Sequence, residues 1–360
     1  MDQYLSLCLP YLLDNKCILF LGPRFARNEQ GQVIFEVVQQ QLEASSQFSK
    51  KLDYGFENLF IFKKNKPETV DKLLLNQKLK EIYSAARPHP LYDRLALLPF
   101  SAVISCSPDL MLKQNMEQKG IGANYYFYSP KGNAGRRSIP DWPILFNVFG
   151  DIGVEDSLIT TYADFFKFVI SILGDEQQLP LDLKNAIASA KIFLFCGFDL
   201  TKWYIPLLVH KLHRYKEESG NPDLSAIVDH DNKRDKNVER YYPVQMLWLD
   251  DQNIVSIDEL YKEVEKAGRL RRPNTGNKGP VFEKARALIA DNQLDQAIAH
   301  VLEAYRQKNR SVNEVTLLQA RKTRNDTAFA TGQITRETYN VEQTNIENAV
   351  LSFADQADKF

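Results

Sequence analysis

The chain has 360 residues, 44% of them hydrophobic, so it can form one large domain and one small domain, each with its own core. Its formal net charge of −1 gives no electrostatic reason to expect a nucleic acid or an acidic membrane as the main partner. Four scattered cysteines form no C-x-x-C pair and five histidines show no metal-ligand spacing, so we expect reduced thiols and no metal centre. No apolar run is long enough to span a bilayer and no leader sequence is recognisable, which predicts a cytoplasmic protein.

Short apolar runs alternate with helical patterns through the first three quarters of the chain. The predicted strands are residues 17–21, 102–106, 125–128, 143–149, 192–196 and 244–249. The predicted helices between them are residues 1–16, 33–42, 54–82, 91–98, a helix from 110, 165–172, 203–213 and 257–267. This alternation predicts an α/β domain with a mainly parallel, Rossmann-like sheet over residues 1–267.

The first strand, residues 17–21 (CILFL), ends in the turn Gly22-Pro23-Arg24. A buried strand that enters a glycine turn is how a doubly wound fold begins a nucleotide pocket, because the turn brings backbone N–H groups close to a phosphate. Ordinary turn chemistry is the alternative explanation for a single glycine after a strand. No glycine-lysine-serine or glycine-lysine-threonine run follows any strand, which excludes a P-loop.

Beyond the α/β domain the sequence changes character. Residues 215–240 are charged and predict a surface loop, and residues 268–280, rich in glycine, proline and arginine, predict a linker. Residues 281–360 are helical throughout, with segments 281–290, 294–307, 313–329 and 336–357, and so predict a small all-α bundle. Ser311 with Glu314 predicts a capping box, and Thr335 a cap for the last helix.

Four segments in this order resemble the sirtuin-like (silent information regulator) NAD pocket in the form used by bacterial antiphage defence proteins. Residues 22–24 (GPR) stand where that family has Gly-Ala-Gly, and residues 105–109 (SCSPD) where it has Thr-Thr-Asn-Tyr-Asp. Residues 147–150 (NVFG), followed by 157–161 (SLITT), stand where it has Lys-Leu-His-Gly and Ser-Leu-Val-Leu-Thr. Residues 197–203 (GFDLTKW) are similar to its Gly-Phe-Ser-Leu segment. The resemblance implies a pocket for NAD or a related nucleotide.

Three positions depart from the family pattern. The resemblance places the family's general-base histidine at Phe149 and its water-holding asparagine at Ser107. Phenylalanine cannot accept a proton, and the loss of a general base typically costs about 10²–10⁴-fold in rate. Arg24 replaces a glycine where the backbone must approach a pyrophosphate. These departures predict a pseudoenzyme, whose α/β domain either holds NAD or a related nucleotide without cleaving it or serves as an assembly scaffold.

The resemblance nominates a set of site residues and leaves a second reading open. The residues expected to line the cofactor pocket are Gly22, Pro23, Arg24, Phe25, Ser107, Asp109, Asn147, Gly197, Phe198 and Asp199. If the protein is instead an active NADase, the candidate bases are Asp109, Asp151 and Asp199, with His89 a poorer one. A different nucleotide-processing α/β enzyme is a third, weaker hypothesis. Each position also has a structural explanation: Phe149 as core, and the Asn and Asp side chains as turn and cap residues.

The helical segment resembles the effector-associated domains of bacterial conflict systems. The residues that carry this resemblance are 294–297, 317–321, 332–337 and 342–346. Such a domain implies recruitment of an effector or sensor protein, and a homo-oligomer is a further option. The alternative is a helical appendage that only aids assembly. The sequence as a whole therefore predicts a component of an antiviral defence system.

Overall fold

The computed structural model describes residues 3–54, 60–63, 69–129, 142–173, 179–198, 202, 204–218, 220, 223–228, 242–248, 253–272, 280–290 and 293–359. Their contacts divide the chain into two compact units. One comprises residues 1–133 and 142–272, and the other comprises 134–141 and 273–360. The predicted domain limits at 267 and 281 lie near this division and stay a prediction. Among the described residues, no helix is long and apolar enough to cross a membrane.

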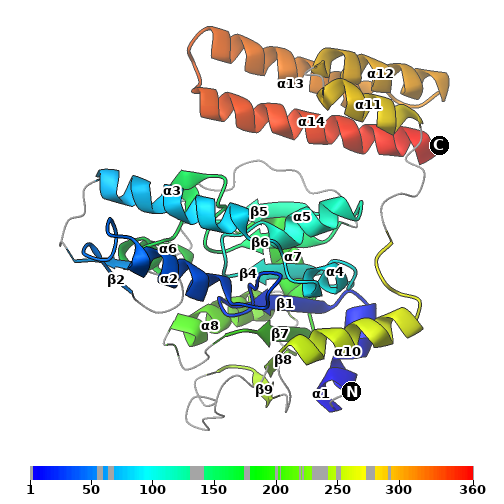
Figure 1. Cartoon of the computed structure of the whole chain (residues 1–360). Coiled ribbons are helices and arrows are strands. Elements are labelled where there is room, and N and C mark those ends of the chain that lie inside the picture. The colour runs from blue at the N-terminus through cyan, green and yellow to red at the C-terminus, as the bar shows by residue number, and fades with distance from the viewer. Residues whose placement is uncertain are drawn as a thin grey trace. The chain divides into compact units, whose positions relative to one another are not determined.

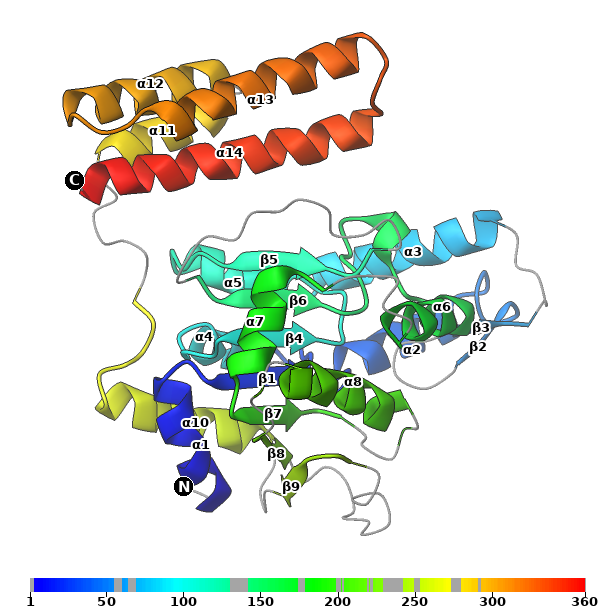
Figure 2. The same cartoon turned by 180° about the vertical axis from the view of Figure 1, so that it is seen from behind.

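A seven-stranded sheet, parallel in every pairing, forms the centre of the first unit (Figures 1 and 2). Its order is β5-β6-β4-β1-β7-β8-β9. The strands are β1 (Cys17–Leu21), β4 (Ala102–Ser105), β5 (Asn124–Phe127), β6 (Ile144–Asn147), β7 (Ile192–Cys196), β8 (Ser225–Val228) and β9 (Gln245–Trp248). The predicted α/β, Rossmann-like parallel sheet is thereby confirmed.

Helices cover both faces of this sheet, because strands buried on two sides need apolar cover on each. One face packs on α1 (Gln3–Leu13), α2 (Ile34–Ala44), α3 (Thr69–Ala85), α4 (Leu91–Leu95), α5 (Met111–Gln118) and α10 (Asn253–Lys266). The other packs on α6 (Tyr162–Leu173), α7 (Leu181–Ser189) and α8 (Tyr204–Glu218). A short 3-10 helix, η1 (Glu155–Ser157), precedes α6. We refer to these as the α5 face and the α8 face.

Two sequence predictions for this unit were wrong in part, and one helix was missed. The helical stretch predicted over residues 54–82, with an interruption at 63–67, is helical only after that interruption, where α3 begins; the hairpin β2 (Leu52–Tyr54) and β3 (Phe60–Phe62) precedes it. Its FIF segment is aromatic and β-branched, which favours a strand. The predicted loop 215–240 contains the end of α8 and all of β8, a strand whose charged flanks concealed it. Helix α7 was not predicted at all.

Four helices make up the described part of the second unit, which is the small all-α bundle that the sequence predicted. They are α11 (Pro280–Ala290), α12 (Leu294–Gln307), α13 (Asn313–Ala330) and α14 (Arg336–Lys359). Thr335 caps α14, since its Oγ1 accepts the Thr338 N–H at 3.2 Å. The capping box at Ser311 is wrong, because α13 begins one residue later than the box requires, and its N-cap, Val312, has no side-chain bond.

Candidate functional site

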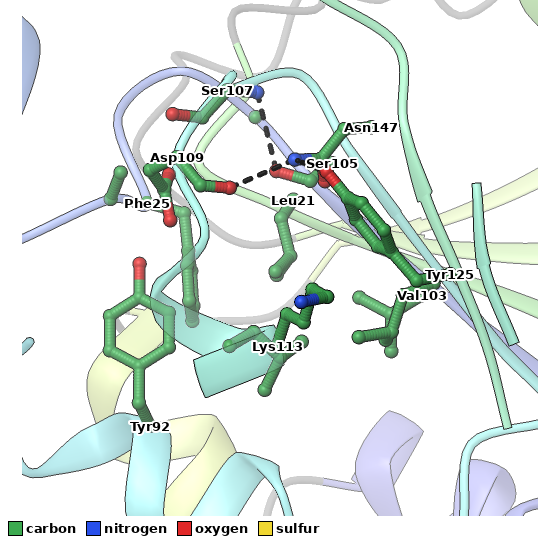
Figure 3. A pocket seen from close by; sticks show the side chains of 14 residues that line it. Leu21, Phe25, Tyr92, Val103, Ser105, Ser107, Asp109, Lys113, Tyr125 and Asn147 are labelled. Atoms are coloured by element: carbon green, nitrogen blue, oxygen red, sulfur yellow. Dashed lines mark hydrogen bonds between the residues drawn. The ribbon is translucent and has the colours of Figure 1, made fainter. Parts of the chain in front are cut away.

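A polar pocket lies on the α5 face at the carboxyl ends of β1, β4 and β6 (Figure 3). The sheet register places Leu21, Ser105 and Asn147 side by side, each as the last residue of its strand. Carboxyl ends of parallel strands are where open α/β sheets bind ligands. The cavity itself is small, about 20 Å³, and the empty space reaches about 410 Å³ only when its open mouth is included. Its lining is Leu21, Gly22, Phe25, Ala26, Tyr92, Val103, Ser105, Ser107, Asp109, Leu112, Lys113, Tyr125, Leu145 and Asn147.

Asn147 belongs to a hydrogen-bond chain that fixes one wall of the pocket. Its Nδ2 donates to the Asp109 carbonyl at 2.8 Å and to the Tyr125 hydroxyl at 3.2 Å. The Tyr125 hydroxyl in turn donates to the Asp151 carboxylate at 3.0 Å, and the Gly153 N–H donates to the other Asp151 oxygen at 2.6 Å. Asp151 therefore supports the pocket from behind and does not line it, with both of its oxygens engaged.

Ser107 is a buried polar group of this pocket. The residue is only 2% exposed, and its hydroxyl lies close enough to the Asp109 carboxyl and the Tyr83 hydroxyl to lower the pKa of both, although it meets the full geometry of a hydrogen bond with neither. Its backbone N–H donates to Ser105 Oγ at 3.2 Å, which fixes the turn after β4 (Figure 3). A buried hydroxyl without a well-formed hydrogen bond costs free energy, and a bound ligand with a polar group would recover it.

Asp109 is the acidic group of the pocket. Burial raises the pKa of its carboxyl, even though Oδ1 accepts the Met111 N–H at 2.9 Å. Two buried tyrosines lie near it: for Tyr83 and Tyr92, burial first and then the Asp109 charge raise the pKa of the hydroxyl. The hydroxyls therefore stay protonated at neutral pH and can act as hydrogen-bond donors.

Lys113 supplies the positive charge. It lies one helical turn after Asp109, and its ammonium sits 5.4 Å from the centre of the Tyr125 ring. Glu117 pairs with it at 2.8 Å, so the ammonium is held against the rim of the pocket. A cation beside open hydrogen-bond donors suits a ligand that carries a phosphate or carboxylate.

The glycine turn after β1 is closed by packing against the turn after β7. The Gly22 N–H donates to the Cys196 carbonyl at 2.7 Å, and the Arg24 N–H donates to the Gly197 carbonyl at 3.2 Å. The Phe25 N–H bonds back to Gly22 at 3.0 Å, and Pro23 has no N–H. These backbone groups are therefore engaged within the protein. Pro23, Arg24 and Gly197 do not line the pocket, and the Arg24 side chain is exposed.

Of the three phenylalanines named from the sequence, Phe25 lines the pocket, whereas Phe149 and Phe198 lie on the α8 face. Phe149 is 2% exposed and packs edge-on against Phe165, with ring centroids 6.1 Å apart. Phe198 packs edge-on against Phe195 at 5.6 Å. Both belong to the apolar core of that face, which matches the structural explanation given for Phe149. Asp199, the remaining predicted position, lies outside the described residues.

The pocket contains residues that the sequence did not nominate. Tyr92, Lys113 and Tyr125 come from α4, α5 and β5. Lys113 could have been predicted as a pocket residue from the sequence, because a residue four positions after Asp109 lies one helical turn further along on the same side. Tyr92 gave no signal, since it reaches the pocket only through the tertiary packing of α4. His89, the poorer fallback base, accepts the Leu91 N–H at 3.1 Å and is not part of the lining.

Fold and pocket together define a Rossmann-like α/β protein with a pocket at the carboxyl edge of its sheet. Residues 101–257 match the SIR2-like domain, and residues 281–358 match effector-associated domain 11. The chain therefore carries a SIR2-like domain followed by an effector-associated domain 11, as the motifs predicted. Strand β1 and Gly22 precede the matched range.

Other comparisons add less. A solved structure described as "Structural Basis for the Mechanism and Regulation of Sir2 Enzymes" is 12% identical, over 74% of this chain and 99% of that one, with a TM-score of 0.36. No curated protein matches the chain. Among the residues that the structure describes, no cluster of side chains could hold a metal ion.

Proposed function

We propose that the pocket binds NAD or a related nucleotide without cleaving it, and that the effector-associated domain communicates this state to a partner effector. In this proposal the protein is a cytoplasmic sensor in a bacterial antiviral defence system. The SIR2-like match supports a nucleotide of the NAD type, and the effector-associated match supports a protein partner. Assembly into a homo-oligomer is compatible with this role.

The chemistry of the lining carries the proposal. Ser107 contributes a hydroxyl, Asn147 the carbonyl oxygen of its amide and Lys113 an ammonium that is shared with Glu117, and these groups suit ribose hydroxyls and phosphate oxygens. No imidazole occurs in this lining, and Phe149 packs in the core of the opposite face. Groups that hold a nucleotide are thus present, while the histidine that the family uses as a base has no counterpart among the lining residues.

The proposal is tested by incubating the full chain with NAD and following ligand and products by mass spectrometry, with thermal melting in parallel. Intact NAD that raises the melting temperature, by less in Ser107→Ala, would support it. A melting temperature that NAD leaves unchanged would reject nucleotide binding.

A second candidate function is NAD hydrolysis with Asp109 as the general base. One observation favours it: Asp109 lines the pocket, and burial raises the pKa of its carboxyl toward the range in which a base is effective. Release of nicotinamide and ADP-ribose by the wild type, abolished in Asp109→Asn, would establish this function and reject the pseudoenzyme. Asp151 is a weaker choice, because Gly153 and Tyr125 already occupy its oxygens.

A further inference from the structure

The second unit contains a groove between α12, α13 and α14 that the proposed nucleotide site does not involve. It holds about 1280 Å³ of empty space and is open to solvent. Its lining is Gln293, Leu294, Asp295, Gln296, Lys322, Asp326, Phe329, Tyr339, Gln343 and Glu347. Three carboxylates face a single ammonium, so the groove carries an excess of negative charge.

The ammonium of Lys322 is already neutralised. It pairs with Asp326 at 2.7 Å and with Asp295 at 2.9 Å, and its side chain is only 14% exposed. Asp326 also accepts the Tyr339 hydroxyl at 3.0 Å. This internal network holds one wall of the groove in place and leaves Lys322 unavailable to a ligand.

Two acceptors on α14 are not satisfied in this way. The Oε1 atom of Gln343 is buried and has no hydrogen-bond partner among the described residues. Glu347 lies one helical turn further on, is half-buried, and forms no ion pair with the described residues. Burial raises the pKa of the Glu347 carboxyl, and no neighbouring cation lowers it.

An aromatic pair completes the groove. The rings of Phe329 and Tyr339 are stacked with centroids 4.6 Å apart, and Phe329 is 41% exposed. The Glu347 charge contributes to the raised pKa of the Tyr339 hydroxyl, so the carboxylate lies close to this ring pair. An exposed aromatic face next to an unpaired carboxylate is the setting in which a planar cation binds well.

We propose that this groove is the docking site for an arginine side chain presented by a partner protein. The guanidinium would pair with the Glu347 carboxylate and would lie against the Phe329–Tyr339 pair. Arginine fits better than lysine, because its planar group can pair with a carboxylate while it stacks on a ring. This inference rests on the proposed function only in taking the second unit to recruit a protein.

The experiment uses the isotope-labelled full chain and a defined probe, N-acetyl-arginine-methylamide, followed by NMR. We expect saturable shifts of the Gln343 side-chain amide and of the Phe329 and Tyr339 rings. The neutral citrulline analogue should bind about tenfold more weakly, because it lacks the charge. Glu347→Gln should weaken the arginine probe by a similar factor. Glu342→Gln is the matched control, since Glu342 is engaged by Arg321 at 2.8 and 3.0 Å and should leave binding unchanged.

Equal shifts with arginine and citrulline, no shifts, or shifts that map outside the groove would each overturn the docking site. Equal effects of Glu347→Gln and Glu342→Gln would also overturn it. The NAD-induced change in melting temperature, measured on the same variants, separates this inference from the nucleotide proposal. Glu347→Gln should leave that change intact, so either result can fail while the other stands.

Discussion

A β-carbon added to Gly22 would lie 2.1 Å from the carbonyl oxygen of Gly197. Gly197 itself has a φ of +72°, and a β-carbon there would lie 2.6 Å from the Phe25 nitrogen. The two glycine turns after β1 and β7 therefore require glycine in order to pack against each other. In this chain the first glycine is explained by contact between turns, and the pocket for a ligand opens on its other side, toward β4 and β6.

Gly22→Ala should therefore destabilise the first unit by at least about 2 kcal/mol, because the clash is with backbone atoms that cannot move aside. Gly197→Ala should cost a similar amount, since its positive φ alone is worth about 1–2 kcal/mol for a residue with a side chain. Chemical denaturation followed by circular dichroism would measure both. Gly220 has an equally positive φ but open space around it. Gly220→Ala therefore measures the cost of the backbone conformation without the cost of a steric clash.

Tyr125→Phe should remove the link between Asp151 and Asn147 at the back of the pocket. The Asp151 carboxylate would lose one of its donors, at a cost of about 1–3 kcal/mol in stability, and Asn147 would lose one of its acceptors. We also expect weaker nucleotide binding, measured by calorimetry. The matched control is Tyr126→Phe, which removes the hydrogen bond from the Tyr126 hydroxyl to the Asp182 carboxylate at 2.8 Å. Tyr126 belongs to the core of the opposite face of the sheet. This variant should lower stability without changing affinity.

Asp109→Asn should change how stability depends on pH. Burial raises the pKa of the folded-state carboxyl above its unfolded value of about 3.9, so the folded protein favours the protonated form. The stabilisation that this provides is complete below the unfolded pKa and is lost as pH rises through the folded pKa. Asparagine keeps an oxygen for the Met111 N–H but does not ionise.

The melting temperature of the wild type should thus fall relative to Asp109→Asn as the pH is raised from about 4. A thermal scan at several pH values would show this difference, with Asp14→Asn as the control. Asp14 is exposed and forms only a 3.7 Å pair with Lys16, so this variant should follow the wild type. Parallel curves for Asp109→Asn and the wild type would contradict the burial of this carboxylate.

Apolar periodicity predicted most of the fold because long runs and parallel strands leave a clear pattern. Strands such as β1 and β7 are buried on both faces and read as continuous apolar segments. The four helices of the second unit were predicted almost to the residue. Strand β8 was missed because Ser225–Val228 is short and has only three apolar residues, and the charged residues around it dominate the composition of the segment.

Ser107, Asp109 and Asn147 come together in the pocket because parallel strands bring their carboxyl ends to one edge. Phe149 does not join them. Alternation along β6 ends at Asn147, and the turn that follows, with Gly150 at a φ of +89°, sends Phe149 to the opposite face. The alternation of side chains predicts the face of the sheet only for residues within a strand. After the strand has ended, the face depends on the geometry of the turn, which the sequence pattern does not predict.

Arg271→Ala should loosen the end of the first unit. The Arg271 guanidinium donates through Nε to the Leu98 carbonyl at 2.9 Å and through Nη2 to the Phe100 carbonyl, and its backbone N–H donates to the Leu97 carbonyl at 2.7 Å. Burial lowers the pKa of this group to about 10, so it remains charged at neutral pH. These hydrogen bonds hold Arg271, which lies two residues before residue 273, against residues 97–100, the segment that precedes β4.

Loss of the guanidinium leaves the carbonyls of Leu98 and Phe100 without these donors, and we expect a cost of about 3 kcal/mol. Hydrogen exchange should then speed up at the start of β4, and proteolysis after residue 268 should become faster. Arg269→Ala is the matched control, because its side chain is exposed and makes only a 3.5 Å contact with the Leu13 carbonyl. Its effect should stay within about 0.5 kcal/mol. If both variants behave alike, the Arg271 bonds do not hold this part of the chain to the sheet domain.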